Sequence, residues 1–331
     1  MGGFLREGKW VTKDSWEKNS KDGSFQRQTS AFRDRIEDRE GARFQPEAGR
    51  YHLYVSYACP WAHRTLIARA LMGLEDVISV SVVHHFMGDD GWTFDDADGV
   101  VPDPIFNAEF LRDIYVKADP NFSGRVTVPV LWDRKEGTIV NNESREIIRM
   151  FSDAFQSLAT KEVDLAPQNL REDIDAAMDA IYEPINNGVY RCGFAGTQEA
   201  YEAAYAELFE QLDRWEAILD QRRYLVGEQL TEADICMFTT LVRFDPVYFV
   251  HFKCSKKHIF QYENLSNYLR EFYQLPGVAE TVDMEHIRNH YFRSHPNLNP
   301  KRFVPPGPIP DLSVPHDRAR LPGGPPLALR G

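Results

Sequence analysis

Residues 51–83 place the tightest constraint on the fold of this chain. Residues 51–57 alternate in hydropathy and are rich in aromatic and β-branched side chains, which is typical of a strand. Pro60 suits the first position of a helix, where its missing N–H costs no hydrogen bond, and this helix is predicted to run to about Met72. Residues 77–83 are apolar enough to form a strand inside a parallel sheet. A strand, a helix and a strand in about thirty residues predict a right-handed βαβ unit.

Length and charge narrow the class of protein. The chain has 331 residues, which is comfortable for two compact domains. Its 50 acidic and 38 basic residues give a net charge of −12, which argues against a nucleic-acid partner because phosphate binding needs a basic field. No run of about eighteen apolar residues predicts a membrane span, and the first ten residues lack the apolar core of a signal peptide. We therefore expect a cytoplasmic protein.

The chain has 4 cysteines, namely Cys59, Cys192, Cys236 and Cys254. They are scattered, with no Cys-x-x-Cys pair and no Cys/His cluster at the spacing of a zinc site. This pattern argues against a disulfide scaffold and predicts no metal site. It fits a reducing compartment, in which a single cysteine can remain a thiolate.

The sequence divides into four regions by composition and periodicity. The first is polar and reads as an extended leader, the second as a compact α/β domain with a long irregular insertion, and the third as helical. The last region holds 10 of the 20 prolines and is predicted to be an extended arm or disordered. These regions are residues 1–50, 51–160 with the insertion at 84–125, 166–295, and 296–331.

Local patterns predict the remaining elements. Thr231 and Asp234 stand at the spacing of a capping box before an apolar run, which predicts a helix start. Two short strands are expected at 127–133 and 138–141. Helices are expected at 107–118, 143–155, 170–181, 197–221, 231–241 and 263–274.

Cys59 lies where the first predicted strand gives way to a helix. The backbone N–H groups and the dipole of a helix start favour negative charge, so a thiol there has a lowered pKa. Ala62 occupies the position at which a dithiol enzyme carries its second cysteine. A mixed disulfide at Cys59 must then be resolved by an outside thiol, for which glutathione is the abundant candidate. The alternative is a buried and inert cysteine.

Two further features supply contacts for a peptide-like ligand. Pro129 removes a ladder donor from an apolar strand, which an extended edge with a cis Val128–Pro129 bond would explain. The backbone of Val128 would then be open to the ligand, although an ordinary edge proline is the alternative. Glu143 and Ser144 follow at a helix start, capped by Asn141 or Asn142, where they suit the ammonium and carboxylate of a free amino-acid end. Taken alone, Glu143 is usually a favourable dipole contact.

These features together resemble the thioredoxin-like domain of glutathione transferases, which is followed in that superfamily by an all-helical domain. The expected fold is therefore α/β plus all-α. The runs that begin at Gly49, Cys59, Gly124, Asn142 and Phe244 resemble the glutathionyl-hydroquinone reductases, the Xi class of glutathione transferases. The resemblance extends from about residue 20 to 310, and the run Cys-Pro-Trp-Ala is its most specific motif.

The resemblance implies a reaction and a set of residues. The substrate would be a hydroquinone that carries glutathione as a thioether, and glutathione would be the co-substrate, without a metal. The Cys59 thiolate would attack the glutathionyl sulfur, and a second glutathione would release oxidised glutathione. Family contacts to glutathione carry over to Trp92, Arg125, Val128, Glu143 and Ser144. Contacts to the quinol carry over to Tyr190, His290 and Tyr291.

The quinol contacts depend most on the resemblance. From the residues alone, Tyr190 lies in a loop between helices, and His290 and Tyr291 lie where the helical domain ends. Phenol hydroxyls are plausible proton donors to a quinol, whereas half-buried packing is the commoner role of a tyrosine. The resemblance also implies a homodimer. Cys192, Cys236 and Cys254 are expected to be structural.

Two other functions stay open. An Omega-like thioltransferase or dehydroascorbate reductase shares the catalytic cysteine but lacks the long insertion. A non-catalytic module of the glutathione transferase fold would bind a protein partner and would not need a lone cysteine at a helix start.

Overall fold

The computed structural model describes residues 3–12 and 21–330, which form two compact units. Residues 1–2, 13–20 and 331, which belong to the predicted leader and tail, lie outside the described part. The units are discontinuous in sequence. The first contains 3–12, 28–160 and 281–304, and the second contains 21–27, 161–280 and 305–330.

A mixed four-stranded sheet forms the centre of the first unit. The strands are β3 (Tyr51–Val55), β4 (Ser79–Val82), β5 (Val130–Asp133) and β6 (Thr138–Asn141), in the spatial order β4-β3-β5-β6. β3 is parallel to β4 and antiparallel to β5, and β6 is antiparallel to β5. All four predicted strands are present: the strand at 138–141 has its predicted bounds, whereas the other three are shorter because their ends turn into loops.

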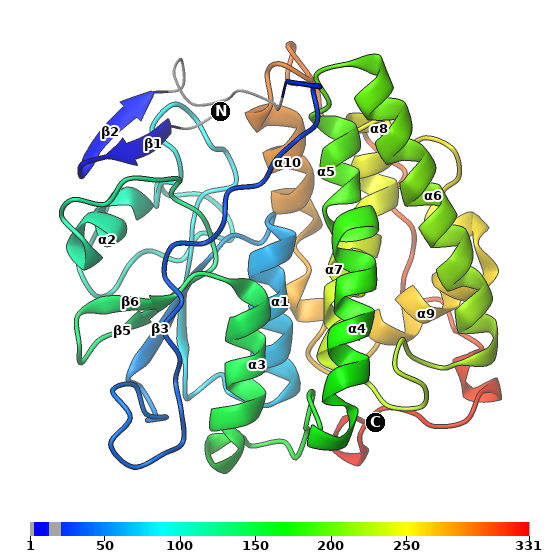
Figure 1. The fold of residues 1–331 in the computed structure, drawn as a ribbon, viewed down its shortest axis with the longest axis horizontal. Coiled ribbons are helices and arrows are strands. Elements are labelled where there is room, and N and C mark those ends of the chain that lie inside the picture. The colour runs from blue at the N-terminus through cyan, green and yellow to red at the C-terminus, as the bar shows by residue number, and fades with distance from the viewer. Residues whose placement is uncertain (1–2, 13–20, 331) are drawn as a thin grey trace. The chain divides into compact units, whose positions relative to one another are not determined.

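Two helices pack together beside this sheet, namely α1 (Pro60–Leu71) and α3 (Ser144–Ala154). Figure 1 shows them side by side next to β3, β5 and β6. Every residue of β3 is buried, and so is most of α1, because sheet and helix share one apolar core. The predicted βαβ unit is therefore confirmed as β3, α1 and β4, and the first unit is thioredoxin-like.

The leader differs from its predicted form. Residues Gly3–Arg6 (β1) and Lys9–Thr12 (β2) pair as an antiparallel hairpin, with Glu7 and Gly8 at positive φ in the turn. Strands of four residues are too short to show a clear alternation in the sequence, which is why composition alone suggested an extended segment.

The last helix of the predicted helical region belongs to the first unit. This helix, α10 (Met284–Ser294), packs with the thioredoxin-like residues. The helical region was predicted to span 166–295, but residues 281–304 are part of the first unit. The insertion contributes α2 (Leu111–Ala118) to the same unit, at the end of the expected helix.

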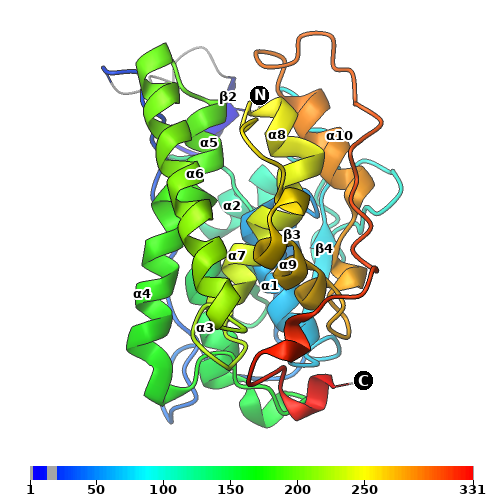
Figure 2. The ribbon, with the colours of Figure 1, turned by 90° about the vertical axis from the view of Figure 1, so that its right-hand side faces the viewer.

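Helices build the second unit, as expected for its fold class. Its α-helices are α4 (Arg171–Ile181), α5 (Gly188–Gly193), α6 (Gln198–Gln221), α7 (Glu232–Arg243), α8 (Phe249–His251) and α9 (Glu263–Tyr273). α5 and α6 pack closely, and α6 also contacts α9; Figure 2 shows the long α6. π-helical turns lead into α5 and α8.

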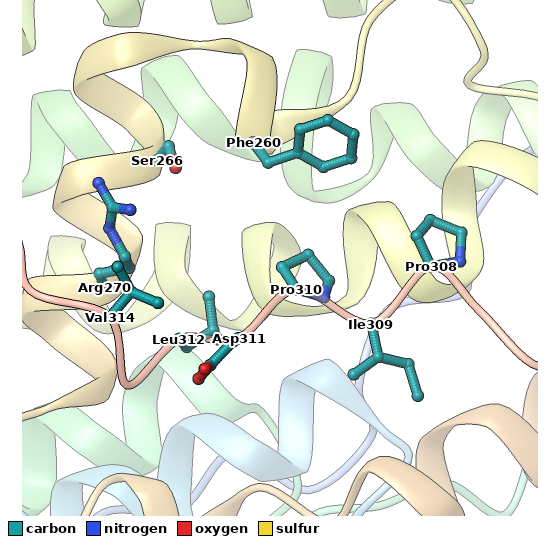
Figure 3. A pocket seen from close by; sticks show the side chains of 9 residues that line it. All are labelled: Phe260, Ser266, Arg270, Pro308, Ile309, Pro310, Asp311, Leu312 and Val314. Atoms are coloured by element: carbon teal, nitrogen blue, oxygen red, sulfur yellow. The ribbon is translucent and has the colours of Figure 1, made fainter.

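A buried cation anchors the proline-rich tail near its end. Arg318 is fully buried and donates to the backbone oxygens of Leu219 and Arg223 at 2.6 and 2.8 Å, near the end of α6. A cavity of about 300 Å³ lies between tail residues 308–312 and a wall that includes Phe260 and Arg270. Figure 3 shows the side chains that line it. None of the residues that line this cavity is a predicted site residue. No helix in the described ranges has both the length and the apolar character needed to cross a bilayer.

Candidate active site

Cys59 stands at the N-cap of α1, between the end of β3 and Pro60. Its backbone is extended, with φ −77° and ψ 119°, and its amide donates to the Ser56 oxygen at 3.1 Å. The side chain is half-buried and forms no cap hydrogen bond, and the first turn of α1 holds no acidic residue. The helix dipole therefore favours a thiolate at this position, with no nearby carboxylate on the helix to oppose it.

The loop before β5 lies against this thiol. The Val128–Pro129 bond is cis, as the sequence predicted, and the Cys59 sulfur lies 3.5 Å from the Val128 oxygen. The buried Tyr115 holds the loop, because its hydroxyl donates to the Thr127 oxygen at 2.8 Å and accepts from the Thr127 amide at 3.2 Å. Tyr115 had no distinguishing signal in the sequence, since its role depends on a loop 12 residues away.

Glu143 is itself the N-cap of α3, so the prediction that Asn141 or Asn142 caps this helix is wrong. The Glu143 carboxylate accepts from the Arg145 amide at 3.4 Å and from the Ser30 hydroxyl at 2.9 Å. Asn141 instead accepts from the Glu143 amide at 2.7 Å, while Asn142 accepts from a backbone amide of the leader. Ser30 was not predicted, because nothing in a polar leader distinguishes one serine from its neighbours.

A buried cation connects the starts of α1 and α3. The Arg64 guanidinium donates to the Ser144 hydroxyl at 3.3 Å and lies 4.4 Å from the centre of the Trp61 ring. Arg64 and Ser144 are both buried. Because Ser144 is the first residue of α3, this cation and the helix dipole create a positive region beside Glu143, suited to a carboxylate.

Trp92 and His290 come from segments almost 200 residues apart and stack with ring centroids 4.9 Å apart. The His290 Nδ1 lies 2.9 Å from the His85 backbone oxygen, which can only accept, so Nδ1 carries the proton. A neutral His290 ring then accepts at Nε2 and donates there only when it is protonated. Tyr291 is buried beside His290, with centroids 5.4 Å apart. Burial lowers the pKa of His85 to about 4, so that ring is neutral at pH 7.

Arg125 and Tyr190 are placed by other segments. Arg125 is half-buried in the loop before the cis-proline. Tyr190 belongs to the second unit and lies in α5, so the predicted loop is wrong there: the amides of Tyr190 and Arg191 bond the Asn187 oxygen at 2.9 Å. The Arg27 guanidinium lies 4.7 Å above the Tyr190 ring. Arg27 was not predicted because, like Ser30, it lies in a polar leader in which nothing distinguishes it from its neighbours.

The other cysteines are all buried, in contrast to Cys59. The Cys236 sulfur lies 3.8 Å from that of Met178, inside the apolar core of the second unit. Burial raises the pKa of the Cys254 thiol well above its ordinary value. In the described ranges, no group of three or more His, Cys, Asp or Glu side chains could hold a metal ion.

A thioredoxin-like unit followed by a helical unit is the architecture of glutathione transferases. Comparison with protein families agrees with this. The model described as "Glutathione S-transferase, N-terminal domain" matches residues 58–154, and "Glutathione S-transferase, C-terminal domain" matches residues 198–271.

Individual relatives narrow the class. Glutathionyl-hydroquinone reductase YqjG of Escherichia coli is 55% identical over 325 residues, which cover 96% of this chain and 98% of that protein. PcpF of Sphingobium chlorophenolicum, also a glutathionyl-hydroquinone reductase, is 49% identical over 311 residues, covering 94% of this chain and 97% of that protein. The structure of a Xi class glutathione transferase from Natrialba magadii is 53% identical, with a TM-score of 0.92, covering 97% of this chain and 98% of that one. The chain belongs to the glutathionyl-hydroquinone reductases, the Xi class of glutathione transferases.

Proposed function

We propose that this chain reduces glutathionyl-hydroquinones with glutathione, through a mixed disulfide at Cys59. The observation that carries the proposal is the half-buried Cys59 sulfur at the open start of α1, 3.5 Å from the Val128 oxygen. The relatives' names supply the substrate class, namely a hydroquinone that carries glutathione as an aryl thioether.

The first step transfers the glutathionyl group to the enzyme. The Cys59 thiolate attacks the glutathionyl sulfur, the bond from that sulfur to the ring carbon breaks, and a disulfide forms. The electron pair leaves with the ring carbon, which gains a proton to give the hydroquinone. Splitting one difficult displacement into two covalent steps lowers each barrier. We assign the acid and hydrogen-bonding roles toward the quinol to Tyr190, His290 and Tyr291.

The second step regenerates the enzyme. Ala62 occupies the place of a resolving cysteine, so the thiolate of a second glutathione attacks the disulfide. Oxidised glutathione and the Cys59 thiolate result. In total, two glutathione equivalents are oxidised to the disulfide and give up two electrons. One equivalent enters as the thioether of the substrate and the other as free thiol. The ring carbon gains the electron pair together with a proton.

The residues that we assign to glutathione are Trp92, Arg125, Val128, Glu143 and Ser144. The Val128 backbone is suited to pair with the peptide-like part of glutathione, as an added strand does. The positive start of α3 with Arg64 suits the γ-glutamyl carboxylate, and the Glu143 carboxylate suits its ammonium group. Arg125 is assigned to a carboxylate, and Trp92 to covering the tripeptide.

The decisive experiment follows both steps. The purified chain is mixed with a glutathionyl-hydroquinone without free glutathione, and intact mass is recorded, followed by peptide mapping. We expect one glutathionyl group on Cys59 and one equivalent of hydroquinone, and addition of glutathione should then release oxidised glutathione. A Cys59→Ala variant is the control. Hydroquinone release without an adduct on Cys59 would overturn the two-step mechanism.

A second candidate is an Omega-like thioltransferase or dehydroascorbate reductase, because one open cysteine without a resolving partner is sufficient for that chemistry. The two candidate functions are distinguished by the kcat/KM of the chain for three substrates, namely a glutathionyl-hydroquinone, a glutathione mixed disulfide and dehydroascorbate. We expect the thioether to be preferred. We further propose that the chain acts as a cytoplasmic homodimer, which light scattering after gel filtration and fractionation of the source cells would test.

A further inference from the structure

The hairpin of β1 and β2 is attached to the loop that carries Arg125. The Leu5 amide donates to the Gly124 oxygen and the Gly124 amide donates to the Leu5 oxygen, both at 2.9 Å. The Gly8 amide donates to the Phe122 oxygen at 3.0 Å. Gly124 directly precedes Arg125, so the hairpin fixes the backbone from which that side chain extends.

The same hairpin also contacts the turn before Trp92. The Trp10 indole N–H donates to the Asp89 oxygen at 3.0 Å, and the Arg112 guanidinium of α2 lies 5.0 Å from the centre of the Trp10 ring. A Cβ at Gly91 would lie 2.9 Å from that ring, so the turn and the indole are in close contact. Figure 1 shows the hairpin beside α2.

The turn of the hairpin fits closely against its support. Gly8 has a φ of +72°, and a Cβ there would lie only 2.0 Å from the Pro120 oxygen. A substitution at this position therefore has to push the turn away from the loop of residues 119–124. Gly41 offers a comparison, because it has a φ of +78° and no atom within 4 Å of its would-be Cβ.

We propose that this hairpin is a positioning element for glutathione, which orders Trp92 and Arg125 on the two ends of the insertion. The inference rests on the proposed function, which assigns both side chains to glutathione. Both lie on irregular backbone, so without a brace each would lose conformational freedom when the ligand binds. A segment that is already ordered avoids that entropic cost, and the benefit appears in glutathione binding more than in the chemical step.

The first test compares Gly8→Ala with Gly41→Ala. Both variants add a methyl group at a left-handed glycine, and only the first meets the backbone of the insertion. For Gly8→Ala we expect the KM for glutathione and its Kd by calorimetry to rise about tenfold, with kcat at saturating glutathione changed less than about twofold. Gly41→Ala should leave these values close to wild type. Equal effects of the two variants would overturn the proposal.

The second test removes one hydrogen bond with little change in shape. Trp10→Phe keeps an aromatic ring near Arg112 but deletes the N–H that bonds Asp89. Trp215→Phe is the control, because its buried indole N–H has no hydrogen-bond partner among the described residues. We expect a rise of about threefold in the Kd for glutathione with Trp10→Phe alone, and faster hydrogen exchange at 86–94 and 120–126.

The readouts separate failure of this inference from failure of the proposed function. Calorimetry with glutathione needs no quinol and no turnover. If the wild-type chain binds glutathione but does not reduce the thioether, the proposed function fails while the hairpin is still tested by the Kd values. If the wild type turns over and both hairpin variants keep its Kd and KM, the hairpin has no positioning role and the inference is wrong. A variant that lowers kcat and leaves KM unchanged would contradict it equally.

Discussion

Two helix starts in this molecule are built in opposite ways. At α7 the N-cap is Thr231, and the Asp234 carboxylate accepts from the Thr231 amide at 2.8 Å and its hydroxyl at 3.1 Å. The same carboxylate accepts from the Leu225 amide and the Tyr268 hydroxyl, both at 2.9 Å. At α1 the N-cap is Cys59, which makes no side-chain cap and has no acid in the following turn.

The difference separates a helix start that serves folding from one that is available for chemistry. At α7 the carboxylate takes up hydrogen-bond donors that would otherwise be buried without partners, which is where a capping box gains its stability. At α1 a carboxylate would oppose a thiolate, and a hydroxyl cap would occupy amides that the sulfur's charge can use. We therefore expect the start of α1 to be the more reactive of the two and the less stabilising.

The strongest test of this comparison is loss of the sulfur. Changing Cys59→Ser keeps a polar N-cap but removes the nucleophile, since a serine hydroxyl is almost fully protonated at neutral pH. We expect turnover of a glutathionyl-hydroquinone to fall by more than about 10³-fold, because the covalent step is lost. Steady-state formation of oxidised glutathione measures it, and circular dichroism confirms that the variant is folded. Activity within about tenfold of wild type would exclude Cys59 as the nucleophile.

At α7 the corresponding change should affect stability. Changing Asp234→Ala leaves two backbone amides and the Tyr268 hydroxyl buried without this acceptor. We expect the free energy of unfolding to fall by about 4 kcal/mol, from several lost hydrogen bonds to a charged group. Urea denaturation measures this change. A loss below about 1 kcal/mol would show that the box is dispensable, and the exposed Asp311→Ala is a matched control far down the chain.

The same carboxylate predicts a pH dependence. Burial raises the pKa of Asp234 to about 6, against an ordinary value of 3.8. Because the folded state holds this proton more tightly than the unfolded state does, protonation of Asp234 stabilises the fold. This stabilisation is fully present below pH 3.8 and is lost as the pH rises to about 6. The loss from this group is up to about 3 kcal/mol. Unfolding free energies of wild type and Asp234→Asn across pH 4–7 give the contribution as their difference, since other groups titrate in both. A difference that does not vary with pH would contradict the prediction.

Local patterns in the sequence predicted the parts of the fold and of the candidate site that depend on neighbouring residues. The βαβ unit with Cys59, the cis Val128–Pro129 bond and the capping box at α7 each follow from a few consecutive side chains. The remaining parts depend on distant contacts. His290 bonds a backbone oxygen 205 residues away, so no local pattern could show that α10 belongs to the first unit. The hairpin in the leader was also not predicted, because the residues that it packs against lie in the insertion, far away along the chain.

The comparison also predicts how the cysteines differ in reactivity. Cys59 is half-buried at a helix start, whereas Cys192, Cys236 and Cys254 are buried, and burial raises the pKa of Cys254. We expect iodoacetamide at pH 7 to label Cys59 at least about tenfold faster than any of the others. Peptide mapping over time, with the urea-unfolded chain as a reference for intrinsic reactivity, measures the rates. Labelling of Cys59 no faster than of the buried thiols would remove the physical basis for a thiolate at α1.

The smallest expected effect, a difference in stability between two Cys59 variants, tests most directly whether the start of α1 can be capped as that of α7 is. Serine is a favoured N-cap, and the extended backbone of Cys59 has the conformation from which a serine hydroxyl reaches the amides of the first turn. We therefore expect Cys59→Ser to be more stable than Cys59→Ala by about 0.5–1 kcal/mol, although both are inactive. Urea unfolding of the two variants at one pH gives the difference without the thiol's own titration. A serine variant no more stable than the alanine variant would mean that the first amides of α1 cannot be capped. In that case the local backbone, and not the choice of cysteine, would be the reason that the start of α1 has no side-chain cap. A cysteine at this position would then cost no stability relative to serine.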